Sequence, residues 1–556
     1  MTNVKDNSFD IALKRSPRML NPYIRPMATE RSVYQYIFTP IADYNPESYK
    51  LEPILIKEIP KGTPITEGKY KGGIKYTLTF RDEAVWEDGS PITGLDYAFS
   101  IKTIKHPQTQ AANYRNYLSW VTDVIVDTKN NKKFDIIFKD YYMLAKELAV
   151  SMEVYPRYVY DPANVMAQIT IEELNSDKVS EIISKNTALI DFAKDFNSIK
   201  YGQQIISGPG PYRFKNWITD QMIVLEKKKN YWGEKINSPF LKAGPDEIIF
   251  HIIPDQAGVM SQMKEGNIDL YTNMSADAFF DLKNNDTYKD KFQFFTPELM
   301  KYYYIGINNS KPELSDPKVR RALAKLVDVK SLIEVMDKGL GKQTVGIFNQ
   351  KKEYYNDQLE PIELDIEGAK MILTKQGWAD TNKDGTIDKL LNGEKIEMDL
   401  DMYITGSELS KNLALLLQQN GAEIGIKINI ITKKYSLVRK ENIKTRDYDL
   451  VPLVLSQDLS LDDPYSKWHS DNDSPDDAND MSYRSVSADQ LIDNIRSTRD
   501  SKLRNKYYKE LQKVMYDDQP VIFLYNPKEK IIVSNKWKGK PTIKRPGYLA
   551  NTFVLK

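Results

Sequence analysis

The stretch from residue 396 to 432 constrains the fold most, because its hydrophobic period changes twice. Apolar residues alternate with acidic ones over 396–402, which predicts a strand with one buried face. Leucines at helical spacing follow Ser407, a good helix-capping residue, and isoleucines alternate again over 426–430. A strand, a helix and a strand with short connections form a parallel, right-handed βαβ crossover. Part of the chain is therefore a parallel α/β sheet, which binds ligands in crevices at the carboxyl ends of its strands.

Length and charge narrow the class of protein. The chain has 556 residues, which predicts three to four domains of ordinary size, or fewer large ones. An apolar content of 41% is enough to build folded cores. The net charge is +1, from 78 basic and 77 acidic side chains. This balance gives no electrostatic reason to expect nucleic acid or an anionic membrane as the main partner.

Cysteine is absent, and only three histidines occur, at His106, His251 and His469. Thiolate metal sites, cysteine nucleophiles, disulfides and clustered histidine sites are therefore excluded. A long chain without cysteine is also suggestive of an exported protein. No apolar run is long enough to span a bilayer, and the N-terminus has no apolar signal region. The sequence leaves open whether the protein is cytoplasmic or is the mature form of a protein whose leader has been removed.

The segment WADTNKDGTIDK, residues 378–389, resembles the first half of a calcium-binding loop. The position that should supply a closing glutamate is Leu391, and the sequence after it predicts a strand instead of a second helix. A calcium sensor is therefore excluded, and two alternatives stay open. One is a hydrogen-bonded Asx-turn loop in which Gly385 takes a positive φ. The other is a static structural Ca²⁺ held by Asp380, Asn382, Asp384, the Thr386 carbonyl and Asp388.

Two short patterns raise the alternative of a serine acyl-transferase. Residues 315–318 match S-x-x-K and residues 470–472 match S-D-N, but the third element of such enzymes, K-T-G, is missing downstream. Ser315 is better explained as a helix N-cap, with Pro317 in the first turn.

Two further segments predict helices at the surface of a domain. Residues 168–198 are charged and predict a solvated helix pair whose start carries a capping box of Thr170 and Glu173. Residues 501–516 predict an amphipathic helix, and its expected apolar face consists of Leu503, Tyr507, Leu511 and Met515.

An acidic loop, residues 456–480, follows a strongly apolar strand, which places it where an α/β sheet binds ligands. Asp458 is nearest the strand end and is the best candidate for an anion that pairs with a ligand cation. The chain also contains 35 tyrosines and 7 tryptophans, many in loops, and such side chains suit the walls of a ligand cleft.

Several motifs together resemble the extracytoplasmic solute-binding proteins of ABC importers, in particular the oligopeptide- and dipeptide-binding group. They occur in family order over about residues 18–540. The motifs are YTLTFRDEAVWEDGSPITGLDYAFSIKTIKHP, GPGPYRFKNWITDQMIVLEKKKNYWG, EGNIDL, YYYIGINNSKPELSDPKVRRALAKLVD, AKMILTKQGW and RNKYYKELQKVMYDDQPVIFLY. Pro211 and the segment 168–198 depart from the family pattern. The family's aspartate that binds the peptide amino terminus falls on Asp458 if two residues are inserted before the Asp463–Pro464 pair, and otherwise on Asp462.

The resemblance implies a periplasmic-binding-protein-like α/β fold with two main lobes joined by a hinge, plus an extra lobe. Lobe I would combine residues 1–50, 200–297 and 520–556; lobe II, the extra lobe, would be 51–199; lobe III would be 298–519. It also implies an extracytoplasmic location, in the periplasm or on the outer face of the cytoplasmic membrane. A leader that is removed and a lipidated cysteine that anchors the protein are implied as well, both outside this sequence.

The resemblance implies a binding protein and not an enzyme. Such a protein captures a peptide by hinge closure between its lobes and delivers it to a membrane permease. It would act as a monomer and would need no cofactor. Asp458 would bind the peptide ammonium, while Tyr117, Tyr304 and Trp468 would form aromatic walls and Asn308 a polar contact. Other solutes of the same fold stay open as alternatives: an oligosaccharide, a chelated metal or a signalling peptide.

Overall fold

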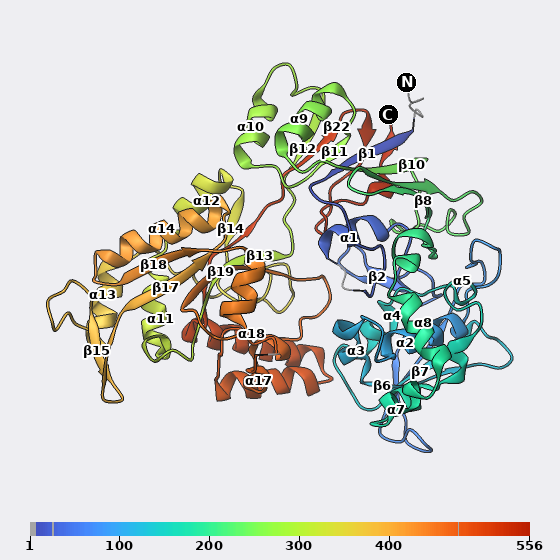
Figure 1. The fold of residues 1–556 in the computed structure, drawn as a ribbon, viewed down its shortest axis with the longest axis horizontal. Helices are drawn as coiled ribbons and strands as arrows, with labels where there is room; N and C mark the ends of the chain where they lie inside the picture. The colour runs from blue at the N-terminus through green and yellow to red at the C-terminus, as the bar shows by residue number, and fades with distance from the viewer. Residues whose placement is uncertain (1–6, 25–26, 476) are drawn as a thin grey trace. The chain divides into compact units, whose positions relative to one another are not determined.

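The computed structural model describes residues 7–24, 27–475 and 477–556. The chain divides into two compact units: unit 1 comprises residues 1–297 and 530–556, and unit 2 comprises residues 298–529. The chain thus leaves unit 1, builds unit 2 as one continuous segment, and returns (Figure 1).

Unit 1 contains a mixed seven-stranded sheet with the N-terminal strand at its centre. The order is β12 (Phe292–Phe295), β22 (Ile531–Ser534), β11 (Leu270–Tyr271), β1 (Ser8–Leu13), β10 (Glu247–Ile252), β9 (Met222–Lys227) and β8 (Tyr212–Ile218). Strand β1 runs parallel to β10 and β11, and the other pairs are antiparallel. Helices α9 (Gln256–Glu265) and α10 (Ala276–Asn284) pack their apolar sides against β12 and β22 (Figure 1). Helix α1 (Ala28–Tyr34) and the short pairs β2–β3 (Ala42–Tyr44, Leu51–Pro53) and β23–β24 (Trp537–Lys538, Val554–Leu555) complete this part.

A separate antiparallel sheet of four strands lies in the same unit, within residues 62–138. Its order is β4 (Gly62–Pro64), β5 (Ile74–Thr79), β7 (Lys133–Phe138) and β6 (Val121–Val126). The helices of this region are α2 (Gly94–Lys105), α3 (Ala112–Leu118), α4 (Ala145–Val150), α5 (Arg157–Tyr160), α6 (Ile171–Leu174), α7 (Val179–Ser184) and α8 (Thr187–Phe196). The second sheet lies within the residues predicted as lobe II, and it belongs to unit 1.

The segment 168–198 is helical as predicted, and the Thr170–Glu173 capping box is present. The prediction of a solvated pair was wrong, because there are three helices and one is half-buried. Helix α8 buries Leu189, Phe192 and Phe196, and the ring of Phe196 meets that of Tyr155 edge-on at 5.3 Å.

Unit 2 is built on a five-stranded sheet that contains the predicted βαβ crossover. The order is β18 (Lys427–Thr432), β17 (Asp399–Ile404), β19 (Leu450–Ser456), β13 (Lys301–Ile307) and β20 (Val521–Phe523). Strand β17 is parallel to β18 and β19, and β13 is antiparallel to its neighbours. Helix α14 (Glu408–Ala422) makes the crossover, and Ser407 caps it by accepting a hydrogen bond from the Ser410 N–H. The first strand starts at Asp399, because residues 394–397 form a separate hairpin strand.

Helices cover the sheet of unit 2 and form its core. The helices are α11 (Pro317–Ala324), α12 (Val329–Asp337), α13 (Ile366–Lys375), α14, α15 (Tyr435–Leu437), α16 (Tyr465–Trp468), α17 (Val486–Ser497) and α18 (Ser501–Asp518). Leucines and isoleucines of α11–α14 pack with the apolar side chains of β13, β17 and β18 in one buried cluster. Two small two-stranded sheets lie outside the main sheet: β14 with β21 (Gly341–Gln343, Tyr525–Pro527), and the hairpin β15–β16 (Asp388–Leu391, Glu394–Glu397).

Two details of unit 2 differ from the sequence predictions. The predicted return to lobe I at residue 520 was too early, because β20 pairs with β13 and β21 with β14, so the chain stays in unit 2 until Glu529. The N-cap of α11 is Asp316, whose carboxylate accepts a hydrogen bond from the Lys318 N–H, while Ser315 ends the preceding 3-10 turn. Pro317 does occupy the first turn.

The amphipathic helix near the C-terminus is present as α18, but its buried face is rotated by about one residue from the predicted one. Tyr508 is buried instead of Tyr507, and Leu503 is 42% exposed. Leu511 and Met515 are buried as expected.

Candidate functional site

The loop that follows β19 carries the predicted ligand-binding aspartate. Asp458 is exposed, two residues beyond the last residue of β19. Its backbone carbonyl accepts a hydrogen bond of 2.5 Å from the Lys352 ammonium. Among the described residues, the Asp458 carboxylate itself has no hydrogen bond or ion pair. This carboxylate is therefore open to a cationic group from outside the chain.

Asp462, the competing candidate, is already occupied by partners within unit 2. The Tyr354 hydroxyl donates to its Oδ2 at 2.8 Å, and the Lys352 ammonium lies 3.7 Å from the same oxygen. The backbone carbonyl of Asp462 accepts a further hydrogen bond from the Tyr508 hydroxyl. The structure thus distinguishes the preferred candidate, Asp458, from its competitor Asp462, because of the two only Asp458 has a carboxylate without a partner among the described residues.

Burial acts on both members of the Lys352–Asp462 pair. It raises the pKa of Asp462, an effect that the Lys352 ammonium and the Tyr354 hydroxyl oppose. It also lowers the pKa of Lys352, and the carboxylates of Asp462 and Asp458 oppose that change. Breaking a buried pair by removing one partner costs about 3–5 kcal/mol, because the other charge is left uncompensated.

The predicted aromatic contacts differ in how much surface they offer. In unit 2, Tyr304 on β13 and Trp468 at the end of α16 are both largely buried. The Tyr304 ring lies 5.6 Å from that of Tyr302. In unit 1, Tyr117 on α3 is 43% exposed. Their contacts with a ligand stay a prediction.

Asn308 follows β13 and has no exposed surface. Its side-chain amide donates to the carbonyls of Arg446 and Tyr448 at 2.9 and 3.0 Å, and its Oδ1 accepts from Ser310. In this arrangement the side chain holds the start of β19 in place, so the predicted polar contact with a ligand gains no support from it.

The sequence did not predict that three further residues contact this loop: Lys352, Tyr354 and Tyr508. Residues 352 and 354 lie in an irregular segment, and Tyr508 is more than 150 positions away on α18. Neither spacing nor a motif connects them to the loop after β19, so no signal in a single sequence identifies them.

The calcium-like loop is held by its own hydrogen bonds. Asp380 accepts from the backbone N–H groups of Asp384 and Gly385 at 3.2 and 3.0 Å, and Gly385 has a φ of +97°. Asp388 is buried, where it accepts from Thr381 and lies 3.1 Å from the Lys395 ammonium. Within the described ranges, no three acidic, histidine or cysteine side chains group so as to hold a metal ion. These contacts agree with the Asx-turn alternative, and a bound Ca²⁺ stays an untested prediction.

Ser315, the candidate nucleophile of the acyl-transferase alternative, donates its hydroxyl to the Pro312 carbonyl at 2.9 Å. That hydrogen bond closes a local turn and gives the serine no general base.

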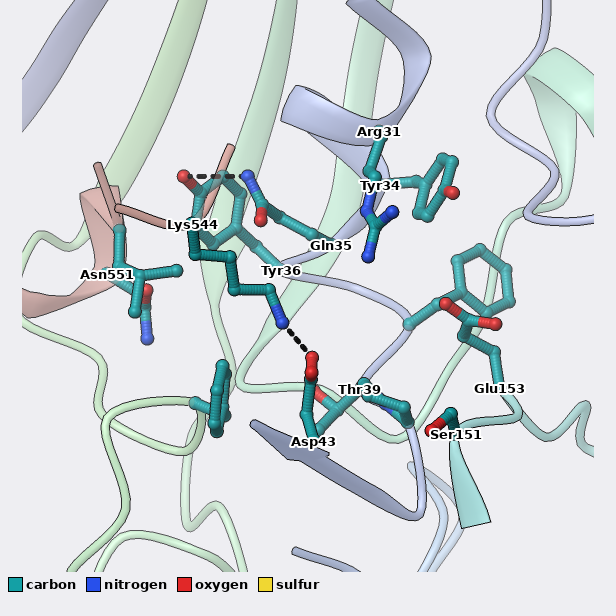
Figure 2. Close-up of a pocket in the computed structure, with 14 residues that line it drawn as sticks. Arg31, Tyr34, Gln35, Tyr36, Thr39, Asp43, Ser151, Glu153, Lys544 and Asn551 are labelled. Carbon is teal, nitrogen blue, oxygen red and sulfur yellow. Dashed lines mark hydrogen bonds and ion pairs between the residues drawn. The ribbon is translucent and has the colours of Figure 1, made fainter. Parts of the chain in front are cut away.

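A polar pocket of about 70 Å³ lies in unit 1 next to α1, which contributes Arg31 and Tyr34 to its lining (Figure 2). Lys544 forms an ion pair with Asp43 on one side, and Arg31 and Glu153 line the other side. Burial raises the pKa of Glu153, which the Arg31 guanidinium opposes. The Thr39 hydroxyl, also in the lining, is buried without a hydrogen-bond partner. The volume and lining suit a few water molecules.

Among the helices of the described residues, none combines the length and the apolar character needed to cross a bilayer.

The two α/β units define the class to which the protein belongs. The structure superimposes on that of the oligopeptide-binding protein AppA from Bacillus subtilis in complex with a nonapeptide, with a TM-score of 0.73 and 20% sequence identity over 99% of each chain. This likeness shows the periplasmic-binding-protein-like fold that the sequence predicted.

The family follows from the sequence pattern described as "Bacterial extracellular solute-binding proteins, family 5 Middle", which matches residues 65–477. The chain belongs to this family of extracellular solute-binding proteins. Two relatives are the oligopeptide-binding protein AppA of Bacillus subtilis and the periplasmic oligopeptide-binding protein OppA of Salmonella typhimurium. AppA is 24% identical over 475 residues, which cover 84% of this chain and 78% of AppA. OppA is 22% identical over 506 residues, which cover 86% of this chain and 82% of OppA.

Proposed function

We propose that this protein is the peptide-binding subunit of an ABC importer, which captures peptides outside the cytoplasm and delivers them to a membrane permease. It makes and breaks no covalent bond. Its family of extracellular solute-binding proteins and the oligopeptide-binding relatives AppA and OppA support this function. The protein acts as a monomer held at the outer face of the membrane by a lipid anchor.

The observation that carries the proposal is the free carboxylate of Asp458 at the carboxyl end of β19. An extended peptide presents a cationic amino terminus, and a carboxylate without an internal partner is a suitable counter-charge for it. Hinge closure would exclude water and strengthen that pair. Main-chain hydrogen bonds and the side chains of Tyr117, Tyr304 and Trp468 would hold the remainder of the peptide with little dependence on its sequence.

The first test is to replace Asp458 by asparagine, which keeps the shape of the side chain and removes its charge. We expect Asp458→Asn to weaken binding of a peptide with a free amino terminus by about 30-fold, because truncating a buried charge pair costs roughly 2 kcal/mol or more. Titration calorimetry with the same peptide carrying an N-acetyl group is the control, and its affinity should change little. Equal losses for both peptides would refute the assigned role.

Native mass spectrometry of the purified wild-type protein tests the ligand class directly. A retained series of peptides is the expected result. A bound sugar or a chelated metal instead of peptide would contradict the proposal and support another solute on the same fold.

A further inference from the structure

We propose that Lys352 is a positioning residue that holds the loop 457–463 so that Asp458 presents its carboxylate to the ligand. The inference rests on the proposed function for the identity of the ligand, whereas the bracing of the loop is independent of it. Lys352 itself does not contact the peptide in this proposal.

The contacts of Lys352 converge on one loop. Its ammonium donates to the backbone carbonyls of Asp458 and Ser460, and it lies 3.7 Å from the Asp462 carboxylate. The residue is only 8% exposed, although it comes from an irregular segment and not from a helix or strand. A lysine ammonium has three N–H donors, and the three groups that it contacts here all belong to the same five-residue stretch, 458–462.

A pair of stacked tyrosines also holds the loop 457–463, through contacts with Asp462. The rings of Tyr354 and Tyr508 stack with their centroids 4.0 Å apart, and Phe348 meets both rings edge-on. The two hydroxyls hold Asp462 by its carboxylate and its backbone carbonyl. Just before the loop, Gln457 donates to the Ile347 carbonyl at 2.9 Å. The loop is thus attached at 457, 458, 460 and 462, and the carboxylate of Asp458 takes part in none of these contacts.

The charges around Lys352 explain why the loop keeps a net negative charge although a lysine holds it. The Lys352 ammonium contacts the Asp462 carboxylate and the backbone carbonyl of Asp458, so one positive charge stands against the two acidic side chains of this loop segment, which carry a net charge of −1 together with it when all three are ionised. Asp462 takes the ammonium as its close partner. The remaining negative charge resides on Asp458, where a peptide ammonium can neutralise it.

This arrangement makes an unusual prediction about the sign of a mutational effect. If Lys352 acted only through its charge, its removal would make the site more negative and tighten the binding of a cationic amino terminus. If Lys352 positions the loop, its removal weakens that binding. We expect Lys352→Met to lower the affinity for a free-amino-terminus peptide about tenfold, since couplings through intermediate residues are commonly of that size. Lys352→Arg retains charge and donors and should restore at least part of the affinity.

Two further variants separate positioning from general damage. Lys352→Met combined with Asp462→Asn leaves no buried unpaired charge, and it should still show weakened binding because the contacts with the carbonyls of 458 and 460 are lost. Tyr354→Phe removes a single hydroxyl and should give a smaller loss. Lys351→Met is the matched control, because Lys351 is exposed and its ammonium pairs with Glu298 at 3.1 Å and not with a residue of the loop 457–463.

The experiment has one readout that needs no ligand and one that does. Hydrogen–deuterium exchange of the free protein should be about tenfold faster across 457–463 in Lys352→Met and in the double variant, but unchanged in Lys351→Met. Calorimetry should show that Lys352→Met changes the peptide affinity by less than about twofold when Asp458→Asn is also present. The reason is that Lys352 can no longer act through a carboxylate that has been removed.

The outcomes distinguish this inference from the proposed function. Faster exchange in the loop, in a protein whose wild type binds no peptide, would support the brace and contradict peptide binding. Peptide binding by the wild type, with unchanged loop exchange or with tighter binding by Lys352→Met, would overturn the role of Lys352. Equal losses for Lys352→Met with and without Asp458→Asn would likewise overturn it.

Discussion

His106 ends α2 with no exposed surface, and its Nδ1 accepts a hydrogen bond of 3.2 Å from the Gln108 N–H. Arg115 packs beside it and donates to its backbone carbonyl at 2.8 Å. Burial, and then the nearby guanidinium, lower the pKa of His106 to about 4. The imidazole is therefore neutral in the folded protein under conditions where it would be protonated in the unfolded chain.

A pH dependence of stability follows from that shift. Between about pH 4 and pH 6.5 the unfolded chain binds more protons at His106 than the folded protein, so stability falls as the pH drops through this window. The loss at pH 4 relative to pH 7 should be about 3 kcal/mol from this residue. Urea unfolding of wild type and His106→Asn at both pH values measures it, since asparagine retains an acceptor for Gln108. The wild type should lose more stability on acidification than the variant, and equal losses would contradict the prediction.

The helix α18 shows the limit of periodicity within one element. Apolar or aromatic residues occur on two adjoining faces, so sequence alone could not choose between Tyr507 and Tyr508. Polar partners make the choice: Gln512 is fully buried and accepts from the Asn356 N–H at 2.8 Å, and Tyr508 reaches the carbonyl of Asp462. Both partners are distant in sequence, and that is why the predicted face was wrong.

At the scale of one element, the loop before the hairpin β15–β16 allows a prediction about calcium binding. Backbone N–H groups and Lys395 already satisfy Asp380 and Asp388, so we expect the loop to keep its structure without an ion. A resident Ca²⁺ at a hundredfold its Kd would add about 2.7 kcal/mol to stability. Thermal unfolding in CaCl₂ and in EGTA should therefore give the same Tm. A higher Tm in CaCl₂ that disappears in Asp384→Asn would show that the ion binds there.

At the scale of the whole molecule, the chain passes from unit 1 to unit 2 and back once. These two crossings determine which fragment can fold by itself. Unit 2 is continuous from 298 to 529 and has its own core of sheet and helices. Unit 1 is discontinuous, because β22, from residues 531–534, lies between β11 and β12 of its sheet.

We therefore expect the fragment 298–529 to fold by itself and the fragment 1–297 to fail. Trp378 and Trp468 are buried in unit 2 and report its unfolding by fluorescence. The fragment 298–529 should show one cooperative transition in urea, whereas 1–297 lacks the strand that joins two parts of its sheet. A cooperative transition for 1–297 would show that β22 is dispensable.

Local patterns in the chain determined much of this protein. The βαβ crossover, the capping box at Thr170, the loop around Gly385 and the family motifs all depend on residues close together in sequence, and the structure contains each of them. Asp458 could also be nominated from its place after a strand. Only the tertiary structure decided that Asp462 is paired with Lys352 and that the strand at 521–523 belongs to unit 2. Those outcomes depend on burial and on contacts between residues more than a hundred positions apart, which no local pattern records.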